Sequence, residues 1–507
     1  MSAAAIALNR FGLGARPTDT LTGEPRRWLD AQLTSFEPRP VALAGLPARA
    51  EIATTLADYF EELRGLRREM GPRRRRQPAA QPMDPQPMDG AQPMMGENAD
   101  PNDELAGLPQ QLRRYIRQDA RATYLTLVAA RANAALTTPA PFVERLVHFW
   151  ANHFAISIDK LPVIALGGML EFEAIRPHVL GRFADMLLAV EQHPAMLLYL
   201  DQAQSVGPNS PAIQRFGRRL QRRQNQPVQT PGLNENLARE ILELHTLGVD
   251  GGYAQEDVTE LARAMTGWSV SGLTRGRGAR FIGLGGTPGD FTFAEAIHEP
   301  GPRRILGRTY PQEGEAQARA ILADLAAHPK TARHLATKLA RHFAGDAPPP
   351  ALVQRLERTY LESGGDLPSL YRVLVAAPET WAPQPVKFKS PWEWSLSALR
   401  ALGTSELQGQ AVAGLMQQLG QPVWRPGSPA GWDDIGSAWA GPDALVRRVE
   451  AAERLAGRTA NVIDARQLAD KALPGAVSDA TRQAIARAES PGQGLAILLV
   501  APEFLRR

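Results

Sequence analysis

The chain has 507 residues, contains no cysteine, and is 22% charged and 44% hydrophobic by the residue set AVILMFWYC. This length is sufficient for a large hydrophobic core, and this composition excludes a wholly disordered or fibrous chain. Without cysteine, the chain cannot form disulfides, thiolate metal sites or cysteine nucleophiles.

Arginine dominates the basic residues, because only six of the 57 Lys and Arg residues are lysine. A GC-rich genome explains this bias toward arginine as readily as the binding of a ligand does. The net charge of +4 is local, since residues 64–76 carry +6, residues 215–223 carry +5 and the remainder carries −7. A basic nucleic-acid-binding surface over the whole molecule is therefore not expected. Anion or nucleic-acid binding by these two segments stays open only as a third hypothesis, because both are typical of solvated loops.

The N-terminal residues MSAAAIALNRFGLGARP include only a short apolar stretch, with no preceding basic residue and no A-x-A site before polar sequence. They do not predict a secretory signal. No apolar run approaches the ~18 residues that a membrane-spanning helix requires. By itself, the sequence indicates a soluble, cytoplasmic protein.

In chain order, residues 1–63 are predicted to form an N-terminal helical part. Residues 64–102 contain three QPM repeats, many prolines and no aromatic residue. Such a segment cannot bury enough apolar surface to offset the entropy lost on ordering, so we predict a disordered insertion. Helical periodicity resumes directly after it, and residues 103–507 are predicted to form the main helical domain.

The main domain is predicted to be a large multi-helix assembly, mainly α, because apolar residues recur three and four positions apart. Pro141 and Pro329 lie near predicted helix starts. Residues 278–310 differ, since β-prone residues separated by Gly and Pro predict a small β-hairpin or meander.

Residues 381–440 form a Trp/Pro-rich C-terminal part that contains six of the nine tryptophans. A packed core explains these residues most simply. The alternative is an aromatic wall beside Asp433 and Asp434 that binds a sugar or a polymer.

One predicted helix, in NENLAREILELHTLG, concentrates polar groups on one face. Asn236, Glu240 and Glu243 lie at i, i+4 and i+7, opposite the apolar arc that contains His245. Carboxylates on neighbouring turns can converge on a cation or act as an acid–base pair. We therefore take Glu240 and Glu243 as candidate catalytic residues, and Asn236 and Arg239 as candidate binding residues. The alternative is a salt-bridged face in which Arg239 and Glu243 pair.

A second predicted helix, in FVERLVHFWANHF, contains His148 and His153. These histidines are ~140° apart on a helix, which is not the i, i+4 spacing of a helical zinc site. They could still point into one pocket if the helix ends near Asn152. His148, His153 and Glu240 are therefore candidate ligands of a divalent metal, and Asn152 is a candidate binding residue. The alternative is that both histidines are buried and hydrogen-bonded.

His298 is the third candidate catalytic residue. It is followed by Glu299 and, beyond a turn, by Arg303 and Arg304, and such a group could hold an anion. A tight turn tied by salt bridges explains the same residues without a site. P-loop, Rossmann, G-x-S-x-G and H-E-x-x-H motifs are absent, so no motif indicates a reaction.

An ordered series of segments spans nearly the whole chain: RLVHFWANHFAIS, NENLAREILELHTLGVDGGYAQEDVTELARAMTGW, HEPGPRRILG, HPKTARHLATKLARHFAGDAPPP, KFKSPWEWSLSALRALG and PAGWDDIGSAWAGPDALVRR. In this series the chain resembles a bacterial family catalogued as domain of unknown function 1800. This resemblance implies a mostly helical protein and brings no established activity. The family's usual His-Asp pair is replaced here by His298 and Glu299, which changes the reach of the carboxylate.

The resemblance also implies a partner, because family members are often encoded beside a sulfatase-like protein with a twin-arginine export signal. The first functional hypothesis is therefore a helical, envelope-associated protein that acts with this partner as a chaperone, cofactor-holding or assembly subunit. Such a protein would stay in the cytoplasm or reach the periplasm by export with its partner.

The second hypothesis is a metal-dependent enzyme, a hydrolase or an oxidoreductase, with its site between helices. In this site, Glu240, Glu243 and Asn236 would face the candidate histidines across the bundle. Convergence of these side chains in one pocket would favour the enzyme, and dispersion would favour a scaffold.

Overall fold

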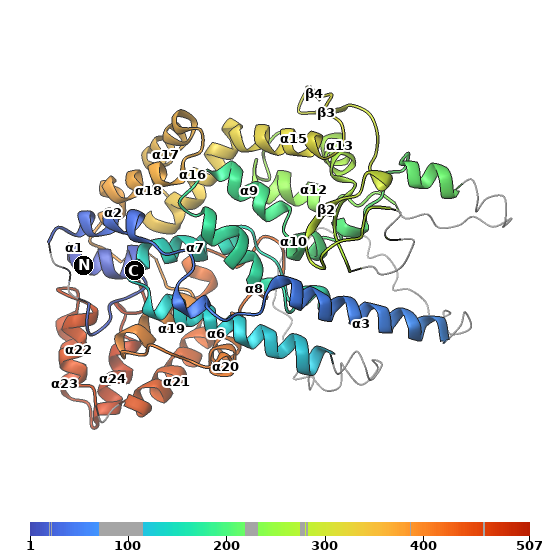
Figure 1. Cartoon of the computed structure of the whole chain (residues 1–507). Coiled ribbons are helices and arrows are strands. Elements are labelled where there is room, and N and C mark those ends of the chain that lie inside the picture. Colours follow the sequence, from blue (N-terminus) through green and yellow to red (C-terminus); the bar gives the residue numbers. More distant parts are fainter. Residues whose placement is uncertain are drawn as a thin grey trace.

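The structure is a computed structural model that describes residues 1–19, 21, 23–69, 115–217, 232–273, 279, 282–385, 387–459 and 462–507. The described part is mainly α-helical, with two small antiparallel sheets of two strands each (Figure 1). The predicted fold class is therefore confirmed.

Helices of eight or more residues occur throughout the described part of the chain. They are α2 (Pro25–Ser35), α3 (Arg49–Glu69), α6 (Arg121–Thr137), α7 (Pro141–His153), α9 (Phe183–Glu191), α13 (Gln255–Met265), α15 (Glu315–Ala327), α16 (Pro329–Ala344), α17 (Pro350–Ser363), α18 (Leu367–Ala376), α19 (Pro391–Ala401), α20 (Gly409–Gln418), α21 (Pro442–Thr459), α22 (Ala465–Ala472), α23 (Asp479–Ala486) and α24 (Pro491–Leu499).

Shorter helical segments connect them. The α-helical ones are α1 (Ala3–Ile6), α8 (Gly167–Met169), α10 (Pro194–Tyr199) and α12 (Asn236–Glu240). The π-helical ones are η1 (Ala7–Phe11), η4 (Tyr115–Ala120), η6 (Leu170–Ile175), η9 (Ile213–Gly217) and η10 (Ile241–His245). Two of these, η6 and η10, supply groups to the site described below. Short π-helical segments are frequent at functional sites.

Proline and capping residues explain where the helices around the site begin. Both α7 and α16 start at a proline, whose fixed backbone angle suits the first helical position. Proline also opens α19, where Ser390 and Glu393 form a reciprocal capping box. The capping box fixes the direction of the first turn of α19, which faces the pocket.

The β insertion begins earlier than predicted, because its first strand follows closely after α13. Strand β1 (Trp268–Val270) pairs with β2 (Phe291–Phe293), and β3 (Arg303–Ile305) pairs with β4 (Arg308–Tyr310). The predicted disordered segment 64–102 overlaps α3 over residues 64–69. The rest of that segment lies outside the described residues.

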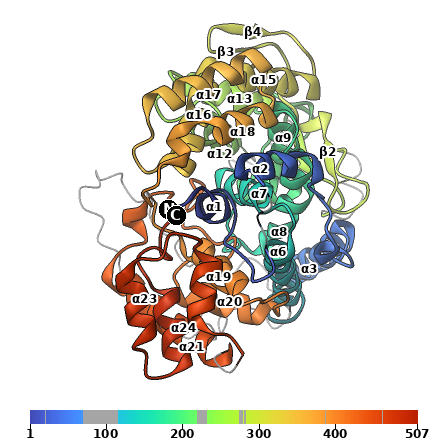
Figure 2. The same cartoon turned by 90° about the vertical axis from the view of Figure 1, so that its left-hand side faces the viewer.

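The helices pack around two hydrophobic clusters. The larger cluster includes residues of α1, α2, α6, α7, α9, α13 and α15–α18, whereas the smaller one joins α19 to α21–α24. Figure 2 shows α7 in the interior, with α16 and α18 on one side and α6 and α19 on the other. Segments far apart in the sequence therefore meet around α7.

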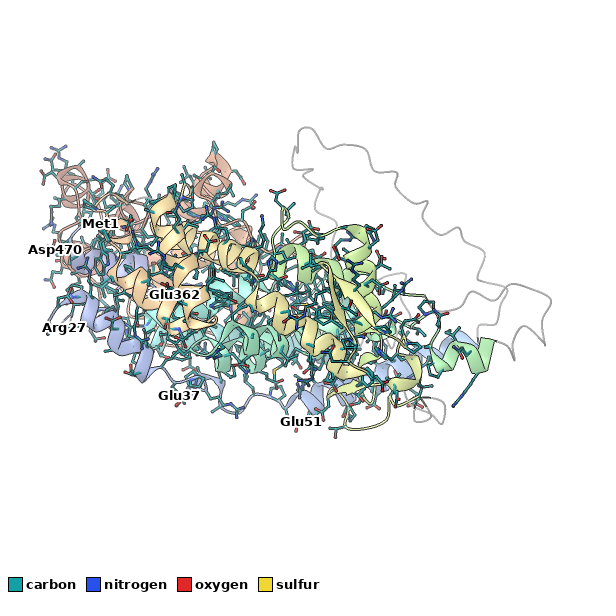
Figure 3. All side chains as sticks on the ribbon, turned by 90° about the horizontal axis from the view of Figure 1, so that it is seen from above. Met1, Arg27, Glu37, Glu51, Glu362 and Asp470 are labelled. Carbon is teal, nitrogen blue, oxygen red and sulfur yellow. The ribbon has the colours of Figure 1, made fainter. Side chains whose placement is uncertain are left out.

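Several charged residues of different helices lie on the outside of this assembly. In the view from above, the labelled exposed residues are Arg27, Glu37, Glu51, Glu362 and Asp470 (Figure 3). Among the described residues, no helix has the length and apolar character needed to cross a bilayer.

Candidate functional site

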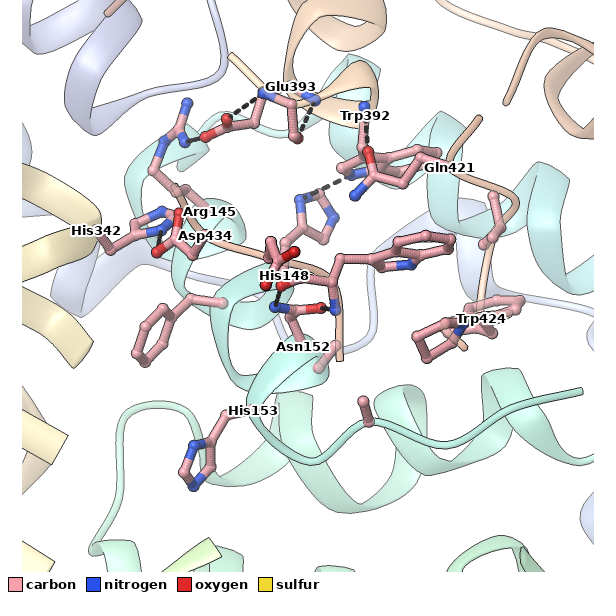
Figure 4. Close-up of a pocket in the computed structure, with 18 of the residues that line it drawn as sticks. Arg145, His148, Asn152, His153, His342, Trp392, Glu393, Gln421, Trp424 and Asp434 are labelled. Atoms are coloured by element: carbon pink, nitrogen blue, oxygen red, sulfur yellow. Dashed lines mark hydrogen bonds and ion pairs between the residues drawn. The ribbon is translucent and has the colours of Figure 1, made fainter. Parts of the chain in front are cut away.

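A pocket of about 120 Å³ lies between α7, α16, the first turn of α19 and the loop of residues 421–434 (Figure 4). Its polar and aromatic lining includes Arg131, Arg145, His148, Asn152, His153, Lys338, His342, Trp392, Glu393, Gln421, Trp424, Trp432, Asp433 and Asp434. On α7, Arg145, His148 and Asn152 are spaced i, i+3 and i+7, so they share one face of the helix. The pocket is therefore built from residues that are more than 300 positions apart in sequence.

Lys338 and His153 form a direct contact in this pocket. The Lys338 Nζ atom lies 3.0 Å from His153 Nδ1. The other ring nitrogen, Nε2, lies 3.2 Å from the backbone oxygen of His245. Because a carbonyl only accepts, Nε2 carries the proton, and Nδ1 is left to accept a hydrogen bond from Lys338. Burial and the nearby Lys338 charge hold the pKa of His153 well below its usual value, so the imidazole is neutral.

Lys338 is itself perturbed. Burial lowers the pKa of its ammonium to about 8, with a further lowering by Arg341 and an opposing effect of Asp434. The Lys338 side chain is only partly buried and lines the pocket. No carboxylate in the described part of the chain forms an ion pair with it. An amine of this kind is partly neutral near pH 8, and a neutral amine is a base and a nucleophile.

The carbonyl groups at the end of η10 position two histidines beneath the pocket. The last carbonyls of a helix lack partners within the helix. Here the oxygen of His245 accepts from His153, and the oxygen of Leu244 lies 3.1 Å from His334 Nε2. The His245 ring is buried, and its Nδ1 lies 2.7 Å from Glu191 Oε1. The π-helical segment thus fixes the tautomer of His153 and, through it, the direction of the Lys338 contact.

Aromatic side chains form a rigid wall of the pocket. The Arg131 guanidinium lies over the rings of Trp392 and Trp424, at 4.4 Å and 5.4 Å from their centroids. Glu171 of η6 binds both Arg131 Nε, at 2.8 Å, and Trp424 Nε1, at 3.0 Å. Trp424 has a φ of 51°, a left-handed conformation that bulky residues rarely adopt. Such conformations persist where surrounding contacts enforce them, often at functional sites.

His148 connects this wall to α7. Its Nδ1 atom accepts a hydrogen bond from Trp392 Nε1 at 3.2 Å. Its Nε2 atom lies 3.7 Å from Glu144 Oε1. Burial, together with the positive charges of Arg131 and Arg176, holds the pKa of His148 well below its usual value. His148 is therefore a neutral, fixed part of the wall.

The carboxylates that line the pocket differ in whether they are already paired with a basic side chain. Asp434 binds His342 Nδ1 at 3.0 Å and Lys387 Nζ at 2.8 Å. Burial raises the pKa of Asp434, but His342 and Lys387 outweigh this effect and hold the pKa below its usual range. Glu393 is paired with both Arg145 and Arg507. Asp433 is exposed and, among the described residues, has no hydrogen-bond or ion-pair partner for its carboxylate.

The loop that carries Asp433 is held against α7 by one amide side chain. Asn152 donates to the backbone oxygen of Trp432 at 2.8 Å and accepts from its backbone nitrogen at 2.8 Å. Gly431, with a φ of 82°, lies so close that an added Cβ would stand 2.3 Å from the Asn152 backbone oxygen. Asn152 therefore acts on the shape of the pocket through the loop.

The structure divides the sequence-predicted site residues into separate places. His148, Asn152 and His153 all line the pocket. Glu240, Glu243 and His298 do not line it. Among the described residues, no three His, Asp or Glu side chains come together in a way that could hold a metal ion. The structure therefore brings the candidate residues of α7 together in one pocket and leaves Glu240, Glu243 and His298 outside it.

The face of α12 and η10 is occupied by local contacts. Arg239 donates to Gln255 Oε1 at 2.9 Å and pairs with Glu235 at 3.4 Å. The alternative pairing of Arg239 with Glu243 was therefore wrong, because Arg239 turns toward the preceding helical turn. Glu243 instead accepts a hydrogen bond from Tyr253 at 3.3 Å. Burial raises the pKa of Glu240, and the Asn236 side chain at the start of α12 is exposed.

His298 and Glu299 lie in a hydrogen-bonded turn at the β insertion. His298 Nδ1 lies 2.8 Å from the backbone oxygen of Thr266. Both oxygens of Glu299 accept from Asn209, at 2.7 Å from its backbone nitrogen and 2.6 Å from its side-chain nitrogen. Arg303 pairs with Glu260 at 3.3 Å. The hydrogen bonds of this turn therefore account for the polar residues around His298.

Sequence reasoning missed Lys338 as a site residue. One signal could have found it, because lysine is rare in a chain that uses arginine for nearly all its basic groups. A lysine within the amphipathic segment HLATKLARHF is therefore unusual for this composition. Its contact with His153 joins α16 to α7 and could not be read from either helix alone.

Comparison with known proteins gives a family but no activity. Residues 6–506 match the family described as Protein of unknown function (DUF1800). No curated protein and no solved structure matches the chain. Because the family match covers nearly the whole chain, the protein belongs to the DUF1800 family.

Proposed function

We propose that this protein is an enzyme that acts on a small organic molecule in the pocket, with Lys338 as its reactive group. The observation that carries the proposal is the 3.0 Å contact between Lys338 Nζ and His153 Nδ1 in a pocket that leaves part of Lys338 exposed. The dispersed Glu240, Glu243 and His298 are not part of this site.

A reactive amine needs both a neutral form and a fixed direction. Burial supplies the first, because it lowers the pKa of Lys338 to about 8. His153 supplies the second, since its Nδ1 holds one N–H of Lys338 and thereby orients the remaining substituents and the lone pair. Such a side chain can act as a general base or as a nucleophile at neutral to slightly basic pH.

The rest of the pocket is suited to binding. Ligand sites combine apolar and aromatic walls with a few placed polar groups. Trp392, Trp424 and Trp432 provide the wall, and Gln421 has an amide whose Oε1 already accepts from the Trp392 backbone at 2.7 Å. Substrate would therefore be held by contact with the indole rings and presented to Lys338.

The other hypotheses stay separate predictions. A metal at His148, His153 and Glu240 is tested by elemental analysis of protein purified without an affinity tag. A sulfatase-like partner, implied by the family resemblance, is tested by co-purification with the product of the neighbouring gene. Anion binding by residues 64–76 and 215–223 involves positions that lie largely outside the described residues.

Competitive acetylation tests the reactive amine. Each lysine is acetylated briefly with a limiting amount of acetic anhydride over pH 6–11, and peptide mass spectrometry gives the extent at every site. We expect Lys338 to reach half its maximal reactivity near pH 8, and the exposed Lys330 on the same helix serves as the internal comparison.

The same readout tests binding in the pocket. Small molecules that raise the thermal midpoint of the wild-type protein should protect Lys338 from acetylation and leave Lys330 unprotected. Lys338→Met removes the amine, and Lys330→Met is the matched control on the same helix. An ordinary titration of Lys338, or the failure of every stabilising ligand to protect it, would contradict the proposal.

A further inference from the structure

We infer that the substrate is an uncharged aldehyde or ketone, and that Lys338 forms an imine with its carbonyl carbon. This inference rests on the proposed function and specifies its substrate class. It combines the contact between Lys338 and His153 with the charge pattern of the pocket wall.

The arginines of the pocket offer an anionic substrate no unpaired charge. Both arginines of the pocket are already paired, Arg131 with Glu171 and Arg145 with Glu393. A carboxylate or phosphate on the substrate would therefore find no unpaired guanidinium among the described residues of the pocket. The unpartnered carboxylate of Asp433 would repel it. An uncharged molecule meets neither penalty.

The aromatic wall favours a compact, apolar body beside the carbonyl group. The rings of Trp392 and Trp424 are held by Arg131 and Glu171, so the wall does not need to rearrange when a ligand enters. Preorganised walls of this kind lower the entropy cost of binding. The pocket volume of about 120 Å³ restricts the ligand to a small molecule.

The amine and its acceptor suit addition to a carbonyl group. The neutral Lys338 nitrogen donates its electron pair to the carbonyl carbon, and the carbon–oxygen π electrons move to the oxygen. The added nitrogen must then lose a proton. His153 Nδ1 lies 3.0 Å from Lys338 Nζ and can accept this proton. His153 passes this proton to the oxygen, which gives a neutral carbinolamine.

The second half of the step releases water. The remaining N–H proton moves to the carbinolamine hydroxyl, which leaves as water while the carbon–nitrogen double bond forms. The sum is one amine and one carbonyl compound giving one imine and one water, without oxidant or reductant. Because His153 takes a proton from the reacting nitrogen and delivers it to the oxygen, it acts as a general acid–base residue, and Lys338 is the nucleophile.

Reductive trapping tests this inference. The full-length protein at pH 7.5 is incubated with sodium cyanoborohydride and one of four probes: butanal, glycolaldehyde, acetone or the anionic glyoxylate. Cyanoborohydride reduces an imine to a stable secondary amine, and peptide mass spectrometry shows which of the six lysines carries it.

We expect at least one neutral probe to modify Lys338 about tenfold faster than Lys330, or more. At pH 7.5 about a quarter of amines with a pKa of about 8 are neutral, so a substantial fraction of Lys338 can attack a carbonyl carbon. Glyoxylate should modify Lys338 at least about tenfold more slowly than glycolaldehyde does. Lys338→Arg should lose the adduct, and Lys330→Met should keep it at Lys338.

The role of His153 is tested separately, through the rate of trapping at Lys338 and the dependence of that rate on pH. His153→Phe keeps an aromatic ring but removes the proton acceptor, so trapping at Lys338 should slow and its dependence on pH should change. Thermal midpoints of all variants are compared with that of the wild type, so that unfolding is not mistaken for lost chemistry.

The outcomes separate the two proposals. If Lys338 titrates near pH 8 and is protected by ligands but is modified no faster than Lys330 by any neutral probe, the carbonyl inference is overturned and the proposed function survives. If glyoxylate is the fastest probe, the argument from charge is wrong, and the inference that the substrate is uncharged is overturned. If Lys338 titrates as an ordinary amine, both proposals fail.

Discussion

At the scale of single residues, the pocket depends on buried charges that are paired one by one. Arg131 is 9% exposed and Glu171 only 1%, and their side chains are joined by a contact of 2.8 Å. Removing two charges from water is costly, and their attraction offsets this cost only while both partners are present. The pair is therefore a coupled unit and not two independent contributions.

Glu171→Leu should lower the free energy of unfolding by about 3–5 kcal/mol, because it leaves the Arg131 charge buried without a partner. Denaturant titration followed by circular dichroism measures this change. The double variant Glu171→Leu, Arg131→Met should recover a large part of the loss, since no charge is then left unpaired. Equal losses in the single and double variants would show that the two charges are not coupled.

Lys338 shows why single residues of the site were difficult to predict. Its position in an amphipathic helix is ordinary, and its chemistry arises from His153 on α7 and the carbonyl group of His245 on η10. Helical periodicity describes one segment at a time, whereas these contacts join three segments. His148, Asn152 and His153 were accessible to sequence reasoning because all three lie on the single helix α7.

At the scale of elements, the loop of residues 421–434 closes the pocket and depends on a close approach to α7. Gly431 has a φ of 82°, and a Cβ there would lie 2.3 Å from the Asn152 backbone oxygen. Gly427 in the same loop has open space around it, with nothing within 4 Å of an added Cβ. The two glycines therefore differ in what an added methyl group would meet.

Gly431→Ala should destabilise the protein by about 1–3 kcal/mol, because the backbone must leave a conformation that only glycine adopts readily and move away from α7. The variant should also acetylate faster at Lys338, since a displaced loop opens the pocket. Gly427→Ala is the matched control and should leave both the unfolding midpoint and the acetylation rate near the wild-type values. Similar effects of the two substitutions would count against a close-packed loop.

The starts of helices were predictable where neighbouring residues in the sequence specify them. Proline at the first position explains the starts of α7 and α16, and both begin at the expected prolines. The β insertion was predicted from its Gly- and Pro-separated strands, but β1 was missed because WSV is fully buried and follows α13 without a clear break. The pairing of β1 with β2 spans a long connection, which local periodicity does not report.

At the scale of the whole molecule, the pocket lies where the two hydrophobic clusters meet. Arg507 binds Glu393 of α19 at 2.7 Å and the backbone oxygen of His342 of α16 at 2.7 Å. The smaller cluster is therefore connected to the pocket through α19 and the last residues of the chain. Assembly of the site requires both clusters to be folded, which is a long-range property that composition and periodicity do not specify.

Buried neutral histidines make the stability of this assembly sensitive to pH. Burial holds the pKa of His148 and His153 well below the usual value, and lowers those of His334 and His342 to about 4. Between these values and about 6.5, the unfolded chain binds more protons than the folded one. The free energy of unfolding is therefore unaffected by these groups above pH 6.5 and decreases as the pH falls toward 4.

Denaturant midpoints measured at pH 7.5, 6.5, 5.5 and 4.5 should show this decrease, with a slope of about 1.4 kcal/mol per pH unit for each histidine that protonates only on unfolding. His334→Gln keeps a side-chain N–H that can donate to the oxygen of Leu244 but cannot titrate. The free energy of unfolding of this variant should therefore fall less steeply with decreasing pH than that of the wild type, by the slope that one protonating histidine contributes. A flat profile between pH 6.5 and 4.5, or equal slopes in the two proteins, would contradict the neutral buried state of these histidines.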